Sequence, residues 1–142
     1  MTLVADANVA VKWFIQQQGS DHARRVQSYR GALIAPAMLI AETTNGFWRH
    51  VVHGDVSPDF ARTAVIGLPR WFAELVEDQL LGPAALDLAV ELNYPLYDCI
   101  YLALSLTSQR TSASSIAQPL QSTGRTSSTS PIGPEPHALR AH

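Results

Sequence analysis

The sequence predicts an α/β fold built on a parallel sheet, because short apolar runs alternate with segments of helical spacing through residues 1–106. The chain has 142 residues, of which 46% are hydrophobic and 15% charged, and this is enough apolar material for the core of one domain. All its aromatic residues (3 Trp, 4 Tyr and 4 Phe) lie between Trp13 and Tyr101, so the core is expected to lie before residue 107.

In the first half, strands are predicted where an apolar run ends at a polar residue or a proline. Residues 2–5 form one such run, which ends at Asp6, and residues 32–35 form another, which Pro36 closes. Helices are predicted over residues 8–15, over residues 21–29 after a capping Ser20, and over residues 38–49.

Prolines mark most boundaries in the second half. Ser57-Pro58-Asp59 combines a Ser cap, a Pro in the first turn and an early acid, so it predicts a helix start, and Pro69 is expected to end that helix. The remaining predictions are a short strand over residues 71–76, a helix that begins at Pro83 and ends before Tyr94-Pro95, and a last helix capped by Asp98.

Residues 107–142 differ in composition from the rest of the chain. They hold 13 Ser or Thr, four of the 9 prolines and no aromatic residue, and their few apolar side chains follow neither a strand nor a helix period. Such a segment buries too little surface to offset its backbone entropy, so we expect it to be mostly disordered.

Charge and cysteine content exclude several classes of protein. The net charge of −2 excludes a histone-like polycation, and a single cysteine, Cys99, excludes an internal disulfide framework and a Cys-based zinc site. Asp6 falls inside what would be the hydrophobic region of a signal peptide and no basic residue precedes it, so no targeting signal is expected. The longest uncharged apolar runs are shorter than the roughly 20 residues that span a bilayer. We therefore expect a soluble cytoplasmic protein without a membrane segment.

Three carboxylates stand in unexpectedly apolar segments: Asp6, Glu42 and Asp98. Burying a lone carboxylate is costly unless it is paired or binds a metal, and no Lys or Arg lies within three residues of any of them. Oxygen ligands alone suit Mg²⁺ or Mn²⁺. Asp6 also follows a predicted parallel strand, where ligands of such sheets bind, and Asn8 is placed to orient it.

Each carboxylate also has a purely structural interpretation. Asp6 and Asp98 are both suited to capping the helix that follows them, a role compatible with metal binding. Glu42 could lie on a helix surface as one side of an ion pair with Arg49.

Other candidate residues have simpler interpretations. His50 and His53, with Asp55 nearby, have the spacing of half a metal site but stand at a helix end, where solvated side chains are expected. Paired aromatic residues such as Phe47-Trp48 are expected in the core rather than stacked on bases, and Cys99 is expected to be a small core residue.

Three segments carry these carboxylates in a recognisable order: Val4-Ala5-Asp6-Ala7-Asn8 and the residues up to 14, residues 35–42, and residues 88–104 with Tyr97-Asp98-Cys99. Together they resemble the PIN-domain family, and most closely the VapC toxins of bacterial toxin–antitoxin pairs. The resemblance implies a PIN-like α/β/α sandwich over residues 1–106. It also implies a metal-dependent endoribonuclease in which Asp6, Glu42 and Asp98 hold Mg²⁺ or Mn²⁺ over an RNA phosphodiester, with Asn8 in support. The implied partners are a VapB-type antitoxin and a second copy in a homodimer.

The sequence departs from that family after the third motif. The family continues with a strand, a Thr-x-Asp element that carries a fourth acid, and a further strand, whereas no Asp follows Asp98 here. Residues 107–142 are therefore interpreted as a replacement of the last strands, as a reading-frame change would produce, which leaves the strand over residues 2–5 at a sheet edge. Two functions remain open: a ribonuclease toxin weakened by the missing acid, and a catalytically silent remnant that only binds an antitoxin or dimerises.

Overall fold

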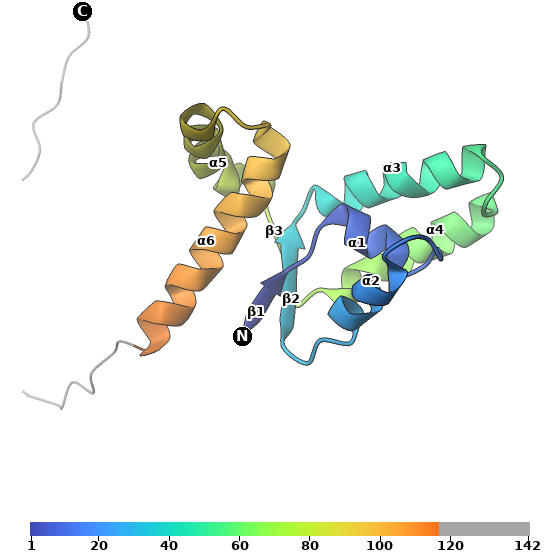
Figure 1. The fold of residues 1–142 in the computed structure, drawn as a ribbon, viewed down its shortest axis with the longest axis horizontal. Coiled ribbons are helices and arrows are strands. Elements are labelled where there is room, and N and C mark those ends of the chain that lie inside the picture. The colour runs from blue at the N-terminus through green and yellow to red at the C-terminus, as the bar shows by residue number, and fades with distance from the viewer. Residues whose placement is uncertain (117–142) are drawn as a thin grey trace, which may run out of the picture.

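The computed structural model describes residues 1–116 and contains a parallel sheet of three strands, covered by helices (Figure 1). The strands are β1 (Thr2–Val4), β2 (Ala32–Pro36) and β3 (Glu74–Val76), in the spatial order β1-β2-β3. Leu3 lies opposite Leu33, and Ala35 lies opposite Leu75. The expected short parallel sheet is confirmed, and β1 lies at its edge among the described residues.

The helices form two groups, one on each face of the sheet (Figure 1). The first group is α1 (Ala7–Lys12), α2 (Ser20–Gln27), α3 (Leu39–Val52), α4 (Pro58–Gly67) and the 3₁₀ helix η1 (Leu68–Trp71). The second group is α5 (Asp78–Leu92) and α6 (Leu96–Ile116), which pack against each other.

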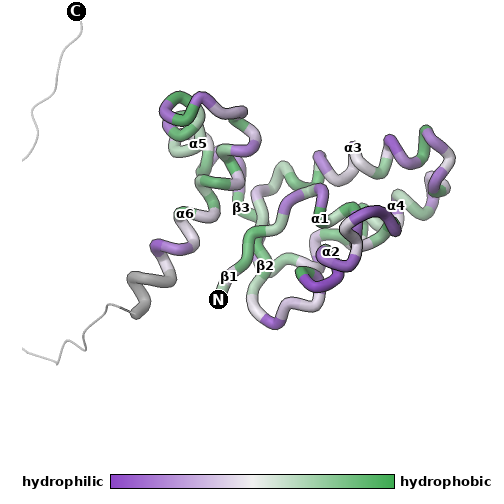
Figure 2. Tube along the Cα trace, viewed as in Figure 1, coloured by the Kyte–Doolittle hydropathy of each residue, from purple (hydrophilic) through white to green (hydrophobic). Residues whose placement is uncertain are grey.

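The central strand β2 is hydrophobic along its length (Figure 2), and its side chains belong to two separate core clusters. Leu33 and Ala35 pack in a cluster with Leu39 and Phe72 on the face of the first helix group. Ile34 packs on the opposite face, in a cluster that includes Cys99 and other residues of α5 and α6. The alternation follows from the two-residue period of a strand. Cys99 is fully buried, as expected.

Some predicted boundaries are confirmed and others are wrong. Ser57 caps α4, because its hydroxyl accepts a hydrogen bond of 3.1 Å from the backbone N–H of Phe60. Ser20 instead begins α2, whose N-cap is Gly19, and its hydroxyl accepts from the N–H of Gln17. Pro83 lies inside α5 and does not start it.

The last helix also differs from the prediction. α6 continues past residue 106 to Ile116, so the boundary expected at residue 107 falls inside a helix. The rest of the expected tail, residues 117–142, lies outside the described residues. Within the part of the chain that the structure describes, no helix has the length and apolar character needed to cross a bilayer.

Gly46 permits the close approach of α3 to α1. A Cβ added at Gly46 would lie 2.8 Å from Cγ2 of Val11, a contact shorter than real structures tolerate. Val11 is buried and its branched side chain is restricted in χ1, so it cannot rotate away from an added Cβ.

We therefore expect Gly46→Ala to lower the free energy of unfolding by about 1–2 kcal/mol, because the cost of overpacking exceeds the gain in helix propensity. Urea denaturation measures this change. Gly67→Ala is the matched control, since a Cβ there meets nothing within 4 Å and Gly67 is the last residue of α4, with a helical φ of −78° and ψ of −20°. The control should raise the stability by up to about 1 kcal/mol, and an equal loss in both variants would contradict the packing argument.

Candidate functional site

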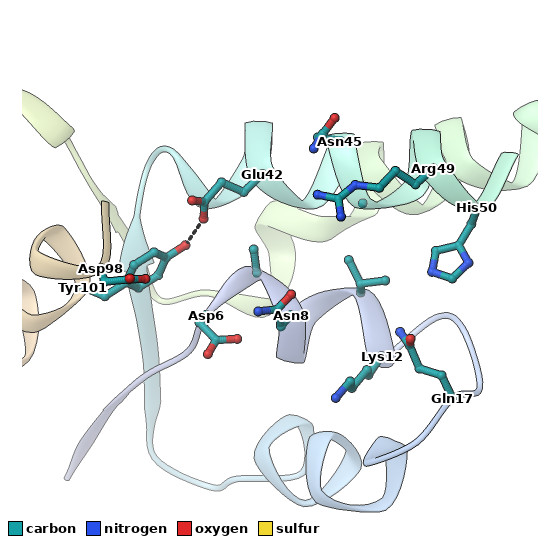
Figure 3. Close-up of a pocket in the computed structure, with 13 residues that line it drawn as sticks. Asp6, Asn8, Lys12, Gln17, Glu42, Asn45, Arg49, His50, Asp98 and Tyr101 are labelled. Carbon is teal, nitrogen blue, oxygen red and sulfur yellow. Dashed lines mark hydrogen bonds between the residues drawn. The ribbon is translucent and has the colours of Figure 1, made fainter. Parts of the chain in front are cut away.

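A single cavity of about 660 Å³ is lined by all three carboxylates predicted from the sequence, Asp6, Glu42 and Asp98, and by Asn8 (Figure 3). Asp6 follows β1, and Glu42 lies in the first turn of the helix that follows β2. Asp98 lies in the first turn of α6. The carboxyl ends of parallel strands meet at one edge of the sheet, and this brings residues that are far apart in sequence to one place.

Asp6 is the N-cap of α1. Its Oδ1 accepts a hydrogen bond of 2.8 Å from the backbone N–H of Val9. The capping interpretation is therefore confirmed. Because the cap occupies one of the two carboxylate oxygens, it leaves Asp6 able to serve a second role.

Asp98 is not the cap of α6, contrary to the prediction. The helix begins two residues earlier, at Leu96, and the carbonyl of Pro95 accepts the hydrogen bond from the N–H of Cys99. Asp98 therefore stands in the first turn, where a carboxylate interacts favourably with the helix dipole. Its side chain is exposed and free to meet a ligand.

Glu42 is half-buried and accepts a hydrogen bond of 2.6 Å at Oε2 from the hydroxyl of Tyr101. Within residues 1–116 it forms no ion pair with Arg49, so the surface ion-pair interpretation is wrong. The hydrogen bond joins α3 to α6, the two helices that carry Glu42 and Asp98.

Tyr101 was not predicted as a site residue. Burial raises the pKa of its phenol far above the ordinary value, and the hydrogen bond and charge of Glu42 and the charge of Asp6 raise the pKa further. A backbone hydrogen bond with Ala7 has a smaller, opposite effect on the pKa. The phenol therefore stays protonated and acts as a donor to Glu42 over the physiological range.

The donors that line this end of the cavity are suited to Mg²⁺ or Mn²⁺, since carboxylate and amide oxygens are the ligands that these ions prefer. They do not form a compact cage: within the described residues, no three His, Cys, Asp or Glu side chains group closely enough to hold a metal ion. Mg²⁺ commonly keeps several waters and binds through one or two carboxylates, so a loose set of acids fits a hydrated ion.

The opposite end of the cavity carries side chains that the sequence did not predict to lie beside the three acids. Lys12 of α1 and Arg49 and His50 of α3 line it, with the amides of Gln17 and Asn45 (Figure 3). Helical spacing could have identified them: Lys12 lies four residues after Asn8, and Arg49 lies seven residues after Glu42, which places each pair on one helix face.

The two histidines have separate roles. Nδ1 of His50 lies 2.7 Å from Oδ2 of Asp55, and its side chain is largely buried. His53 is exposed, and its ring nitrogen is hydrogen-bonded to the carbonyl of Arg49. The solvated placement was therefore right for His53 and wrong for His50.

The expected core position of the aromatic pairs is only partly confirmed. Phe47 is buried and packs edge-on against Phe14, whereas Trp48 is 60% exposed. Trp13 packs against Phe72, and Trp71 is 43% exposed.

No model of a known protein family matches this chain, and no curated protein matches it either. Membership of the PIN-domain family therefore stays a prediction from the motifs around Asp6, Glu42 and Asp98.

Removing the phenol hydroxyl with Tyr101→Phe should lower the free energy of unfolding at neutral pH by about 1–2 kcal/mol, because Glu42 loses a hydrogen bond to a charged group. The pKa of Tyr101 is raised in the folded state, so its stabilising contribution is complete below the ordinary pKa of 10.0 and is lost as pH rises above it. Urea titrations should therefore show a smaller difference in the free energy of unfolding between Tyr101→Phe and the unmodified chain above pH 10 than at neutral pH. Tyr97→Phe, at a 67% exposed position of the same helix, should change little at either pH.

Proposed function

We propose that this chain is a PIN-like, metal-dependent endoribonuclease of the VapC toxin type. The observation that carries the proposal is the single cavity at the carboxyl edge of the sheet, where Asp6, Glu42 and Asp98 stand opposite Lys12 and Arg49. Acids at one end are suited to a divalent cation, and cations at the other end are suited to the phosphates of a nucleic acid strand.

The reaction proposed is hydrolysis of an RNA phosphodiester. A water oxygen bonds to phosphorus, one P–O ester bond breaks, the leaving alcohol takes a proton, and the other proton of the water goes to solvent. Asp6, Asp98 and Glu42 would hold Mg²⁺ or Mn²⁺, and Asn8 would support them. When bound, the ion supplies charge stabilisation to the phosphate oxygens and lowers the pKa of water.

Two of the chain's own groups prepare this end of the cavity. The hydroxyl of Tyr101 fixes one carboxylate oxygen of Glu42 and leaves the other available. The cap on α1 fixes one oxygen of Asp6 in the same way. Orientation by such hydrogen bonds is typical of residues that surround a metal ion in proteins.

The same proposal includes a VapB-type antitoxin and a homodimer as partners. Support comes from α5 and α6, which carry exposed apolar side chains, among them Leu86 (56% exposed), Val90 (75%), Leu102 (37%) and Leu106 (38%). Apolar side chains exposed in this number favour a protein–protein contact.

A silent PIN-like module is the second candidate function. The observation that favours it is the absence, within residues 1–116, of a compact group of metal-ligating side chains. Thermal unfolding with and without Mn²⁺ separates the two candidates, because a metal that binds the folded state raises the melting temperature. A rise that Asp98→Asn removes supports the nuclease, and no rise at millimolar Mn²⁺ supports the silent module.

Asp98→Asn should lower metal-dependent cleavage of a fluorescent single-stranded RNA by about 100-fold or more, because the variant removes a ligand charge. The fold should be kept, since Asp98 is exposed, and its stability should be unchanged or higher because repulsion among the acids falls. Asp87→Asn, at an exposed position of α5 outside the cavity, is the control and should cleave normally. Cleavage that persists in Asp98→Asn with excess chelator would contradict the proposed site.

A further inference from the structure

The cavity has a cationic half, which we define as Lys12, Arg49 and His50 (Figure 3). Its side chains come from α1 and α3, whose close packing is set at Gly46 and Val11. The acidic half of the same cavity lies toward β1 and the start of α6.

Lys12 and Arg49 have no acidic partner among the described residues. The ion pairs within residues 1–116 join Arg24 to Asp21, Arg62 to Asp59 and His50 to Asp55. The acids of the cavity therefore form no ion pairs with Lys12 and Arg49. The acids remain available to a metal ion, and the two cations remain available to a negatively charged ligand.

His50 differs from the other two because its ring is held in place. Asp55 contacts Nδ1 at 2.7 Å, and the side chain is only 24% exposed. A carboxylate at one ring nitrogen fixes the orientation of an imidazole and leaves Nε2 as the remaining polar atom. Since His50 lines the cavity, that atom is the one available to a ligand there.

We infer that the cationic half binds the sugar–phosphate backbone of single-stranded RNA, next to the phosphodiester that lies at the acids; this rests on the proposed function. Lys and Arg side chains are donors only, which is the chemistry that phosphate oxygens require. The amides of Gln17 and Asn45, which line the same cavity, both donate and accept, as contacts to ribose or base edges require.

The dimensions of the cavity support one strand. A volume of about 660 Å³ falls in the range of about 300–1,000 Å³ that takes a compact ligand, so it holds a nucleotide or two and not a duplex. Arg49 lies seven residues after Glu42, which is about 10 Å along α3. At about 3.4 Å per stacked nucleotide, the arginine is placed to contact a phosphate up to about three nucleotides from the one at Glu42.

The test is RNA binding without metal, so that it does not depend on cleavage. A fluorescein-labelled, unstructured RNA of twelve nucleotides is titrated with the full chain in excess chelator, and fluorescence anisotropy is followed at several salt concentrations. Arg49→Ala and Lys12→Gln should each lower the affinity about three- to tenfold and reduce the salt slope by about 0.7, the value for one phosphate contact on a single strand. Arg110→Ala is the matched control, because this exposed residue lies about 18 Å along α6 from Asp98.

The direction in which Asp55→Ala changes the RNA affinity shows whether Asp55 positions His50 or only adds negative charge. Removing an acid near bound phosphates should tighten RNA binding on electrostatic grounds alone. If Asp55 holds His50 against the RNA, the affinity should fall instead, and His50→Gln should lower it to the same level. Asp59→Ala, an exposed acid at the start of α4, is the control for lost charge and should leave the affinity unchanged or slightly higher.

The inference is overturned if Arg49→Ala and Lys12→Gln bind RNA as Arg110→Ala does, if Asp55→Ala binds more tightly, or if a duplex of the same length binds as well as the single strand. Circular dichroism and melting temperature show that each variant is folded before it is counted. The proposed function fails separately: a chain that binds RNA through the cationic half but cleaves nothing with Mg²⁺ or Mn²⁺ keeps this inference and loses the nuclease.

Discussion

The parallel pairing of β2 with a strand on each side is the constraint on which the site depends. Because β1, β2 and β3 run in the same direction, their carboxyl ends lie at one edge, and the chain that leaves each strand enters a helix there. Asp6 and Glu42 follow two of these strands, so the register that pairs Leu3 with Leu33 also sets where the two acids stand. The burial of both faces of β2 enforces this register, since a slip of one residue would exchange its two cores.

The third acid reaches the same edge by a different route. α6 belongs to the helix group on the other face of the sheet, yet Tyr101 packs with the core cluster of the first group and donates to Glu42. The residue one turn later in α6, Ser105, donates to the carbonyl of Tyr101 and not to the site. Tyr101 therefore links the two helical layers at the edge of the sheet. Asp98 lies three residues before it in α6, a helix that is held in place by the packing of its buried residues against Ile34 and α5.

The sequence predicted β1 and β2 well because each is a short apolar run followed by an acid or closed by a proline, and tertiary packing agrees with that pattern. The third strand is shorter than expected, since only residues 74–76 of the predicted 71–76 form it and Trp71 ends η1. Prediction from the sequence failed where tertiary packing overrides the local structural preference of a residue. Pro83 is expected to start a helix, but α5 begins one turn earlier, at Asp78, and Leu81 of that turn is buried in a cluster with Ile34 of the sheet. The helix therefore lacks the one backbone hydrogen bond that Pro83 cannot donate. The Ser and Thr content after residue 106 predicts disorder, whereas in α6 the hydroxyls of Thr107 and Thr111 donate to carbonyls one turn earlier, at Ala103 and Thr107.

At the site, too, some residues are visible from local sequence and others only after the helices pack. Asp6, Glu42 and Asp98 were predicted because a carboxylate in an apolar segment is conspicuous in a sequence, while Lys12 and Arg49 are ordinary surface residues until α1 and α3 are packed together. The acidic half needs three elements, β1, α3 and α6, to keep their relative positions, whereas Lys12, Arg49 and His50 need only α1 and α3. A shift of α6 would therefore disperse the acids and leave the cations in place. Under the proposed function, loss of cleavage therefore does not require loss of RNA binding, because the two depend on different sets of elements.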